Sequence, residues 1–320
     1  MLMLLSIFKK YRMQCGLIVI ASLIMILFMA TSPKTFLRPH IYLAFLSTVP
    51  FIGIMAVGIT VVLVSAEIDL SFPAVMAFSG FAFATGYGFT GSLLVGIVLA
   101  CAAGAAVGTL NGLMVTKIGI PSIIITLGMQ FLIRGAVNIL AGGKAKSLRG
   151  IVESPVFHAL VGKVGGVIPA QSLWWLAITV IVWFMLFRHR FGDHVLFVGD
   201  NQETARMMGI NVVRTKTLVF IAMGILAAFA GVLNTCRLLT WWPTMGEGYL
   251  MMVMAAAFVG GTSMFGGEGT ILGTFIGAFL IGSLEAGIVA AGLSGFWTRF
   301  VYGLLILIAV SVHAYLRKRE

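Results

Sequence analysis

The chain has 320 residues, of which 60% are hydrophobic and only 10% are charged. Soluble globular domains carry about 25% charged residues, so this composition excludes an ordinary soluble protein. The 21 Lys and Arg residues outnumber the 10 Asp and Glu residues, which gives a net charge of +11. In a soluble chain this excess would suggest nucleic-acid binding, but here the positive charges lie in short gaps between apolar runs. We therefore expect an integral membrane protein, surrounded by lipid and without a nucleic-acid partner.

The apolar runs predict the membrane spans, because a spanning helix needs about 20 predominantly apolar residues. Ten runs qualify: 16–31, 41–65, 72–89, 91–115, 122–141, 172–188, 215–236, 249–265, 270–291 and 296–315. Two of them, 72–89 and 249–265, are short and rich in glycine or next to glycine-rich turns. Each of these two could be a broken or re-entrant helix instead of a full crossing. The expected fold is all-α, a single transmembrane domain over residues 1–320 with about ten helices.

The distribution of Lys and Arg predicts the orientation of these spans. With the N-terminus in the cytoplasm, ten crossings place more of the basic residues on the cytoplasmic side than on the other side. The cytoplasmic group would be Lys9, Lys10, Arg12, Lys117, Arg188, Arg190, Arg206, Arg214, Lys216, Arg317, Lys318 and Arg319. This bias agrees with the positive-inside rule, so we expect both termini to be cytoplasmic.

Glycine recurs at every fourth position in two of the runs. The two trios are Gly104, Gly108 and Gly112, and Gly269, Gly273 and Gly277. A spacing of four places each trio on one face of a helix, where it lets another backbone approach closely. We favour tight packing within one subunit over a seam between two subunits.

Motifs of catalysis and nucleotide binding are absent from the sequence. It contains no H-E-x-x-H or G-x-S-x-G, and its five histidines are scattered near span ends. The dipeptides Gly143-Lys144 and Gly162-Lys163 lack the Ser or Thr that completes a phosphate-binding loop. We expect no catalytic residue and no metal site, and any ATP that drives this protein must be bound by another chain.

Few ionisable residues fall within the predicted spans. Glu285 is the only acidic residue placed well inside one, and ion-coupled carriers use such carboxylates as relays or cation ligands. It could instead pair with an internal Arg or extend toward the membrane surface. Arg134 lies in the fifth run, where we expect it to link helices or face water and not to bind a substrate.

The longest polar stretch, residues 188–216, lies between two strong spans on the predicted cytoplasmic side. Asp200 or Asn201 can cap a short helix, Glu203 would lie in its first turn, and Gly209 can end it in the left-handed conformation. The apolar side chains that this helix would expose are Met207, Met208 and Ile210. Such a surface suits docking on a cytoplasmic partner, although a solvated helix that folds back on its own span ends fits the pattern equally well.

Three segments resemble a known family. The sequence from Gly199 to Ile210, GDNQETARMMGI, resembles the Gly-x-Asn-x-Glu-Ala-Ala-Arg-x-x-Gly-Ile segment of permease subunits of ATP-binding-cassette importers, of the ribose, xylose and autoinducer-2 type. Residues 65–71, SAEIDLS, are similar to the family's Gly-Gly-Ile-Asp-Leu-Ser turn, with Ala66-Glu67 in place of the glycines. Residues 260–270, GGTSMFGGEGT, resemble the turn before the family's penultimate span.

The resemblance implies a function for the first of these segments and identifies the other two as family turns. The segment at about 190–214 would couple the permease to an ATPase, through Asp200, Asn201, Glu203, Ala205, Arg206, Met207, Met208, Gly209 and Ile210. The other family turns contain Ile68, Asp69, Leu70, Ser71, Gly260, Gly261, Gly266 and Gly267. From the residues themselves, we expect Asp69 or Ser71 to cap the next helix, and the glycines to allow a tight return of a broken helix.

The resemblance also implies an assembly in the bacterial inner membrane. Two permease subunits, identical or different, would pair above a cytoplasmic ATPase that binds ATP and Mg, while this chain holds no cofactor. A periplasmic or extracellular sugar-binding protein would deliver a monosaccharide or similar polyhydroxylated solute. The alternative is a self-sufficient, ion-coupled carrier of a small polar solute.

The loop 237–249 is predicted to lie outside and contains Trp241, Trp242, Glu247 and Tyr249. Its aromatic residues fit an interfacial belt, which we favour. The alternative is a surface that meets the binding protein and the mouth of the pore.

Overall fold

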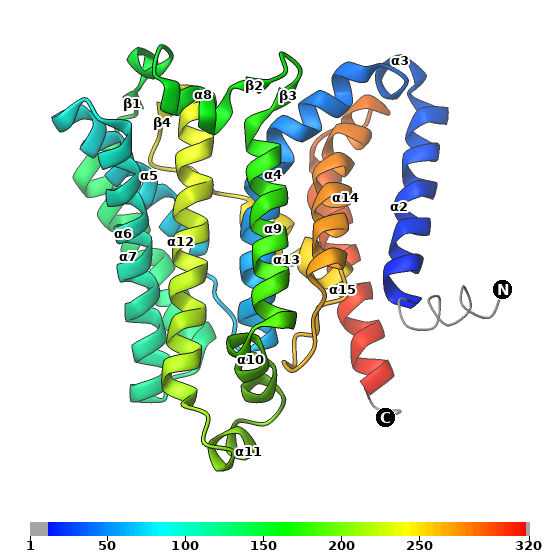
Figure 1. The fold of residues 1–320 in the computed structure, drawn as a ribbon. Helices are drawn as coiled ribbons and strands as arrows, with labels where there is room; N and C mark the ends of the chain where they lie inside the picture. The colour runs from blue at the N-terminus through cyan, green and yellow to red at the C-terminus, as the bar shows by residue number, and fades with distance from the viewer. Residues whose placement is uncertain (1–11, 318–320) are drawn as a thin grey trace.

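The computed structural model describes residues 12–317, and the side chains of residues 16–311. Its elements form one bundle of helices with two short antiparallel strand pairs (Figure 1). Lys9, Lys10, Lys318 and Arg319, and the side chains of Arg12 and Arg317, lie outside the described part. In chain order the helices are α2 (Arg12–Thr31), α3 (Pro33–Phe36), α4 (Pro39–Val64), α5 (Phe72–Thr90), α6 (Leu93–Leu113), the π-helical turn η1 (Met114–Ile118), α7 (Ser122–Ala141), the 3₁₀ turn η2 (Arg149–Ile151), α8 (Pro155–Val161), α9 (Ala170–Arg188), α10 (Arg190–Asp200), α11 (Gln202–Met207), α12 (Val212–Leu238), α13 (Tyr249–Val259), α14 (Ile271–Ala290) and α15 (Phe296–Arg317).

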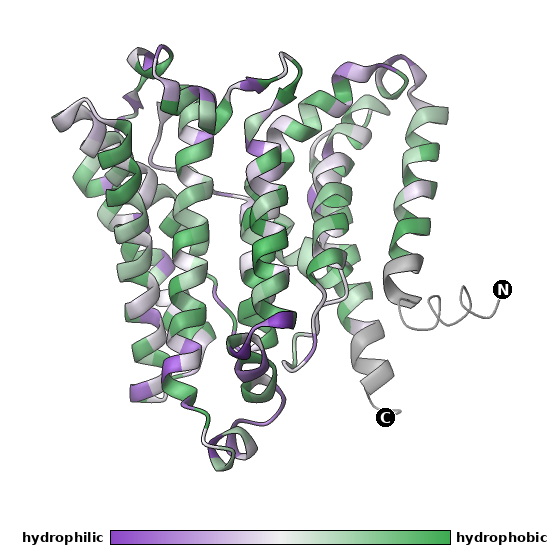
Figure 2. Cartoon of the chain, viewed as in Figure 1, coloured by the Kyte–Doolittle hydropathy of each residue, from purple (hydrophilic) through white to green (hydrophobic). Residues whose placement is uncertain are grey.

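Ten apolar helices coincide with the ten predicted runs. Within the described residues, seven are long and apolar enough to cross a membrane: α4, α5, α6 with η1, α7, α9, α12 and α14. The apolar parts of α2, α13 and α15 are shorter. Apolar residues follow the length of the helices, and polar residues gather in the connections (Figure 2). The all-α polytopic fold is confirmed.

The two short runs have different outcomes. The run 72–89 becomes α5, a helix of 19 residues. The run 249–265 is a broken helix, because α13 has only 11 residues and ends at Val259. The chain between α12 and α13 passes through β4 and a series of turns over residues 243–248, and returns from the end of α12 into the interior of the bundle, so α13 begins about halfway along its neighbours (Figure 1).

Helix α4 forms the core of the bundle. Its most apolar stretch is 89% buried, and its sequence is apolar on every side, as expected for a helix surrounded by others. It contacts α12, α14, α9 and α13. Pro50 lies within it, where proline removes one backbone hydrogen bond.

The glycines of the two trios face neighbours within the subunit, as we favoured, but Gly269 precedes α14 and faces Val64 of α4, so it does not share a helix face with Gly273 and Gly277. Gly104, Gly108 and Gly112 of α6 face α12, where an added Cβ would lie within 2.6 Å of Gly224, Phe220 or Thr217. Gly273 and Gly277 of α14 face the backbone of Gly260 and Ala256 in and after α13. Both seams therefore have a neighbour inside this chain.

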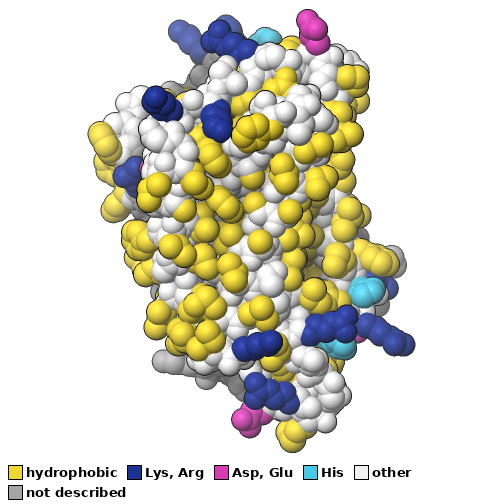
Figure 3. Space-filling model, turned by 90° about the vertical axis from the view of Figure 1, so that its left-hand side faces the viewer, with side chains coloured by type: hydrophobic (Ala, Val, Ile, Leu, Met, Phe, Trp, Pro, Cys, Tyr) yellow, Lys and Arg dark blue, Asp and Glu magenta, His cyan; other side chains and the backbone are white. Residues whose placement is uncertain are grey.

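The two ends of the bundle differ in structure. One end carries α3, α8 and the strand pairs β1 (Lys146–Ser147) with β4 (Thr240–Trp241), and β2 (Lys163–Val164) with β3 (Ile168–Pro169), both antiparallel. The other end carries α10 and α11, together with the start of α2 and the end of α15 (Figure 1). On the side that faces the viewer in Figure 3, hydrophobic side chains cover the middle, and Lys and Arg gather mainly toward the two ends.

Candidate functional site

The polar stretch 188–216 folds into two helices where we expected one. The additional helix, α10, is amphipathic and buries Gly192, Val195, Val198 and Gly199. Val195 and Val198 are three residues apart, a spacing that indicates one face of a helix. This signal is weak because most of the surrounding residues in the stretch are polar or charged. Helix α10 packs against α9, α12 and α4, so it fixes α11 to the ends of three spans.

The short helix α11 begins and ends as predicted. The side-chain oxygen of Asn201 accepts hydrogen bonds from the backbone N–H groups of Glu203 and Thr204, each at 3.0 Å. Gly209 has a φ of 81°, the left-handed conformation that ends many helices. Glu203 lies in the first turn.

The exposed surface of α11 is narrower than predicted. Met207 and Met208 are 81% and 58% exposed, but Ile210 is buried. The N–H of Ile210 donates to the carbonyl of Ala205 in the left-handed stop, which turns its side chain under the helix. There it joins a small cluster with Ala205, Val198 and Val212. Asp200, at the end of α10, and Arg206 remain exposed.

The three family-like segments meet at this end of the bundle. The carbonyl of Val64, at the end of α4, accepts a hydrogen bond of 2.9 Å from the N–H of Gly267. Gly199 packs so closely on Val64 that an added Cβ would lie 1.7 Å from the same carbonyl oxygen. An added Cβ at Gly266 would lie 2.5 Å from the carbonyl oxygen of Gly199. Segments 65–71, 199–210 and 260–270 therefore form one contact region.

The glycines of the turn 260–270 have two roles. Gly261, Gly266 and Gly267 have φ values of 90°, 84° and 74°, where side chains are strained. Gly260 has an ordinary helical φ, and is required because an added Cβ would lie 2.5 Å from the backbone nitrogen of Thr274. The predicted tight return is confirmed.

The turn 65–71 is held by a buried polar network. A carboxylate oxygen of Asp69 accepts hydrogen bonds from the N–H and the hydroxyl of Ser71, at 2.7 and 2.6 Å, and Asn111 donates to that hydroxyl. Burial raises the pKa of Asp69 above its ordinary value, and the bonds from Ser71 oppose this shift. Ser71 occupies the N-cap position of α5, but its side chain makes no capping bond; Gln130 of α7 accepts the N–H of Ala74 instead. The predicted cap by Ser71 is therefore wrong, whereas Asp69, the other candidate, accepts backbone N–H groups at the start of α5, from Ser71 and Phe72.

Ile68 and Leu70 of the same turn lie toward α7 and α15. The N–H of Ile68 donates to the hydroxyl of Ser122 at 3.1 Å. Ile68 and Leu70 both border an apolar groove, which Ile123 and Met254 also line. This turn therefore links the start of α5 with the start of α7.

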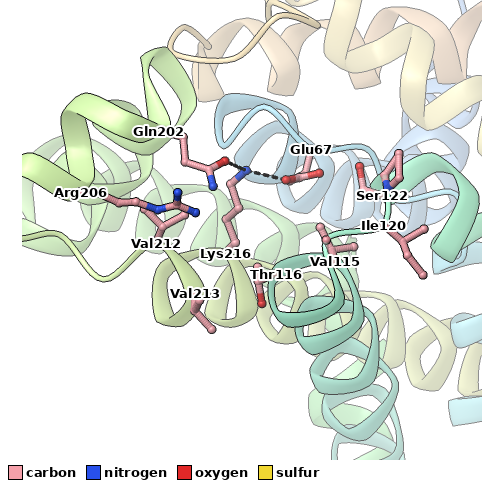
Figure 4. Close-up of a pocket in the computed structure, with 12 residues that line it drawn as sticks. Glu67, Val115, Thr116, Ile120, Ser122, Gln202, Arg206, Val212, Val213 and Lys216 are labelled. Carbon is pink, nitrogen blue, oxygen red and sulfur yellow. Dashed lines mark hydrogen bonds and ion pairs between the residues drawn. The ribbon is translucent and has the colours of Figure 1, made fainter.

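A buried ion pair joins the turn 65–71 to the base of α12. The ammonium group of Lys216 donates to carboxylate Glu67 and, at 3.1 Å, to the side-chain oxygen of Gln202 at the start of α11 (Figure 4). The side chains of Lys216 and Glu67 are 7% and 11% exposed. They border a cavity of about 280 Å³ that Thr116, Ser122 and Arg206 also line. Sequence reasoning missed this pair because 149 positions separate its members.

A second polar contact lies within the spans, at the break between α12 and α13. The guanidinium group of Arg134 donates to the carbonyls of Pro243 and Met245 at 2.7 and 2.9 Å, and to that of Pro73 at 3.3 Å. These carbonyls lie where the backbone is irregular and needs hydrogen-bond partners. The expectation that Arg134 links helices is confirmed.

Known proteins match this chain over most of its length. Residues 41–310 match the family described as "Branched-chain amino acid transport system / permease component". The ribose import permease RbsC of Escherichia coli strain K12 is 34% identical over 92% of this chain and 91% of its own length. RbsC of Bacillus subtilis strain 168 is 34% identical over 90% and 88% of the two chains, and the L-arabinose ABC transporter permease AraH of Azospirillum brasilense is 32% identical over 95% and 88%.

The chain belongs to this permease family. The resemblance to permease subunits of ATP-binding-cassette importers, drawn from three short motifs, is confirmed over more than nine-tenths of the chain. Among the described residues of the permease, no three His, Cys, Asp or Glu side chains are close enough to hold a metal ion.

Two expectations about the permease change with the structure. Trp241 is fully buried, donates from its indole N–H to the carbonyl of Ala77, and packs on Phe81, so it is not a residue of an interfacial belt. Glu285 is exposed on α14, and within the described residues it forms no ion pair with an internal Arg.

Proposed function

We propose that this permease imports a monosaccharide or a similar small polyhydroxylated solute, driven by ATP hydrolysis in a separate subunit. The observation that carries the proposal is the match, over about nine-tenths of both chains, to permeases named for ribose and L-arabinose. A third similar permease, AraH of Escherichia coli strain K12, is also named for L-arabinose transport.

We further propose that α11 is the element that docks on the cytoplasmic ATPase, which would bind the ATP and Mg. Two adjacent methionines, Met207 and Met208, are exposed at the tip of the polar connection between α9 and α12. Their flexible thioether side chains adapt well to an apolar groove on a partner. Asn201, Ala205, Gly209 and Ile210 would hold the helix in shape, while Asp200, Glu203 and Arg206 would form the polar edge of the contact.

In this proposal a movement of the ATPase reaches the spans through rigid contacts. Helix α10 is fixed to α4 through Gly199, and α4 to the turn 260–270 through Gly267. The Lys216–Glu67 pair and Gln202 connect α11 with the turn before α5. A displacement of α11 would therefore move the ends of α4, α5, α12 and α14 together.

The proposed position of α11 in the cytoplasm also sets where the other partners would bind. With both termini and α11 in the cytoplasm, the end that carries α3, α8 and the strand pairs faces the periplasm, or the outside of the cell. We place the contact with the sugar-binding protein there. A second permease subunit, identical or related, would complete the path in the inner membrane.

Reconstitution in proteoliposomes tests the proposal. The permease, its ATPase and its binding protein are combined, and uptake of radiolabelled D-ribose and L-arabinose is measured with and without ATP. We expect uptake that requires all three proteins and ATP. Uptake by the permease alone, driven by a proton or sodium gradient, would establish the ion-coupled carrier in its place.

A further inference from the structure

Glu247 lies in the turns over residues 243–248, on the segment that re-enters the bundle between α12 and α13 (Figure 1). The depth of this segment follows from its contact with Arg134, the thirteenth of the 20 residues of α7. At 1.5 Å per residue, Arg134 lies about 18 Å from one end of α7 and about 10 Å from the other. The segment is therefore within the thickness of the membrane that α7 would span.

The backbone of the segment does not depend on the Glu247 side chain. Arg134 satisfies the carbonyls of Pro243 and Met245, and Gly246, with a φ of 83°, packs against the carbonyl of Pro73. The Glu247 carboxylate is 4.0 Å from the Nε of Arg134, which is beyond hydrogen-bond distance. Within the described residues, its oxygens accept no hydrogen bond.

The exposure of the two charged side chains differs sharply. The Arg134 side chain is 13% exposed, whereas that of Glu247 is 59% exposed. Thr244, Gly248 and Met251 beside it are exposed too. A carboxylate at this depth is too costly to hold against lipid, so it must face water or another polar surface. The Arg134 guanidinium lies beside this carboxylate without bonding to it, which leaves both carboxylate oxygens able to accept hydrogen bonds.

The face of α13 that follows Glu247 leads to a groove. Met251, Met254 and Phe258 lie at spacings of three and four residues, so they share one face of this helix. Met254 and Phe258 line a groove of about 350 Å³, which Ile123 of α7 and Ile306 of α15 close on its two sides. A polar surface at Glu247 and Thr244 is thus followed by an apolar groove toward the end that carries α11.

We propose that Glu247 is a solute-binding residue on a water-lined path along this face. Its two oxygens accept hydrogen bonds from hydroxyl groups of a small polyhydroxylated solute, and Thr244 offers a further hydroxyl beside them. The methionines beyond it contact the carbon skeleton without holding it, so the solute is bound weakly enough to leave. This inference rests on the proposed function for the identity of the solute, but not for the presence of water at Glu247.

Accessibility tests the path without any solute. Glu247→Cys is introduced into a variant without native cysteines and exposed in liposomes to a charged methanethiosulfonate that does not cross membranes. Val167→Cys, in the exposed connection between β2 and β3, serves as the control. We expect Glu247→Cys to react within about tenfold of the control rate. A reactive control with an unmodified Glu247→Cys would overturn the proposal, because it would place this residue against lipid or protein.

Transport kinetics test the binding role in the complete assembly. We expect Glu247→Ala to lower the maximal uptake rate of D-ribose or L-arabinose at least tenfold, and Glu247→Asp to recover part of it. The matched control is Glu153→Gln, an exposed carboxylate in the connection before α8. Unchanged uptake by Glu247→Ala, with an active wild-type assembly, would overturn the inference. If the wild-type assembly transports neither sugar but Glu247→Cys is labelled, the proposed solute class is wrong, while the water-lined path at Glu247 is supported.

Discussion

The ammonium group of Lys216 lies 2.5 Å from a carboxylate oxygen of Glu67, and this contact joins the base of α12 to the turn that precedes α5. Both side chains are almost completely buried beside a polar cavity. The pair therefore fixes the position of this turn relative to α12.

Removing one partner of this pair should destabilise the protein. We expect Lys216→Ala to lower the free energy of unfolding by about 3 kcal/mol, because it leaves the Glu67 carboxylate buried without its partner. The double variant Glu67→Gln, Lys216→Met should recover most of this loss. Thermal unfolding in detergent measures both, with the exposed Lys163→Ala as the control. Equal stability of Lys216→Ala and the control would show that the pair contributes nothing.

The exposed methionines of α11 should affect association and not folding. We expect Met207→Ser combined with Met208→Ser to weaken binding of the ATPase at least tenfold, because an apolar contact at the tip of α11 is lost. Their exposure predicts an unchanged unfolding temperature. A pull-down with the purified ATPase and a titration measure the affinity. The same double change at Val164 and Val167, on the opposite end, should leave it unaltered.

Gly199 should tolerate no side chain. Gly199→Ala places a Cβ 1.7 Å from the carbonyl oxygen of Val64, which forces α10 away from α4. We expect a loss of folded protein, or a destabilisation at or above the about 1–3 kcal/mol that is typical of overpacking. Gly128→Ala in α7 is the matched control, since its Cβ would meet no atom within 4 Å. Similar yields and unfolding temperatures for the two variants would contradict the close packing.

The buried Asp69 should make stability depend on pH. Because its pKa in the folded state is raised by burial, the folded state holds the proton more tightly than the unfolded state. The ordinary pKa of an Asp side chain is about 3.9. The free energy of unfolding therefore falls as the pH rises above this value and through the raised pKa of the folded state. Asp69→Asn keeps an oxygen to accept both bonds from Ser71 and removes this dependence.

We expect Asp69→Asn to gain stability relative to the wild type between pH 4 and pH 7. Unfolding in detergent at the two pH values measures the difference. Asp69→Ala should instead be less stable than Asp69→Asn, by about 1–3 kcal/mol, because the N–H and hydroxyl of Ser71 lose their acceptor. A wild-type stability that changes with pH in parallel with Asp69→Asn would refute this role.

Local patterns predicted the spans and the ends of α11 because their causes are local. Apolar length sets a span, and Asn201 and Gly209 act on the helix that they flank. The burial of Ile210 depends on residues on both sides of the turn, Val198 and Val212, and not on the helix alone. The sequence therefore predicts an exposed Ile210, which is wrong. The same limit applies to Trp241, whose aromatic character fits a membrane interface equally well until its contact with Ala77 is known.

Long-range polar contacts were beyond sequence reasoning. Lys216 was counted only as one of the cytoplasmic basic residues, and Glu67 as an altered motif position. The sequence leaves Arg134 either to link helices or to face water, because its three carbonyl partners depend on how the chain re-enters the bundle after α12. These contacts depend on topology, which hydropathy alone does not determine.

Pro50 gives α4 two mechanical parts. From Phe51 to Val64 the helix is continuous and almost entirely enclosed, a stiff rod about 21 Å long that is fastened to Gly199 and Gly267 at the tip where α10 packs. At Pro50 a hydrogen bond is missing, and the rod meets a joint. In the proposed assembly, a force that the ATPase applies at this tip would be carried along the rod and released as a bend at the joint, about midway along α4.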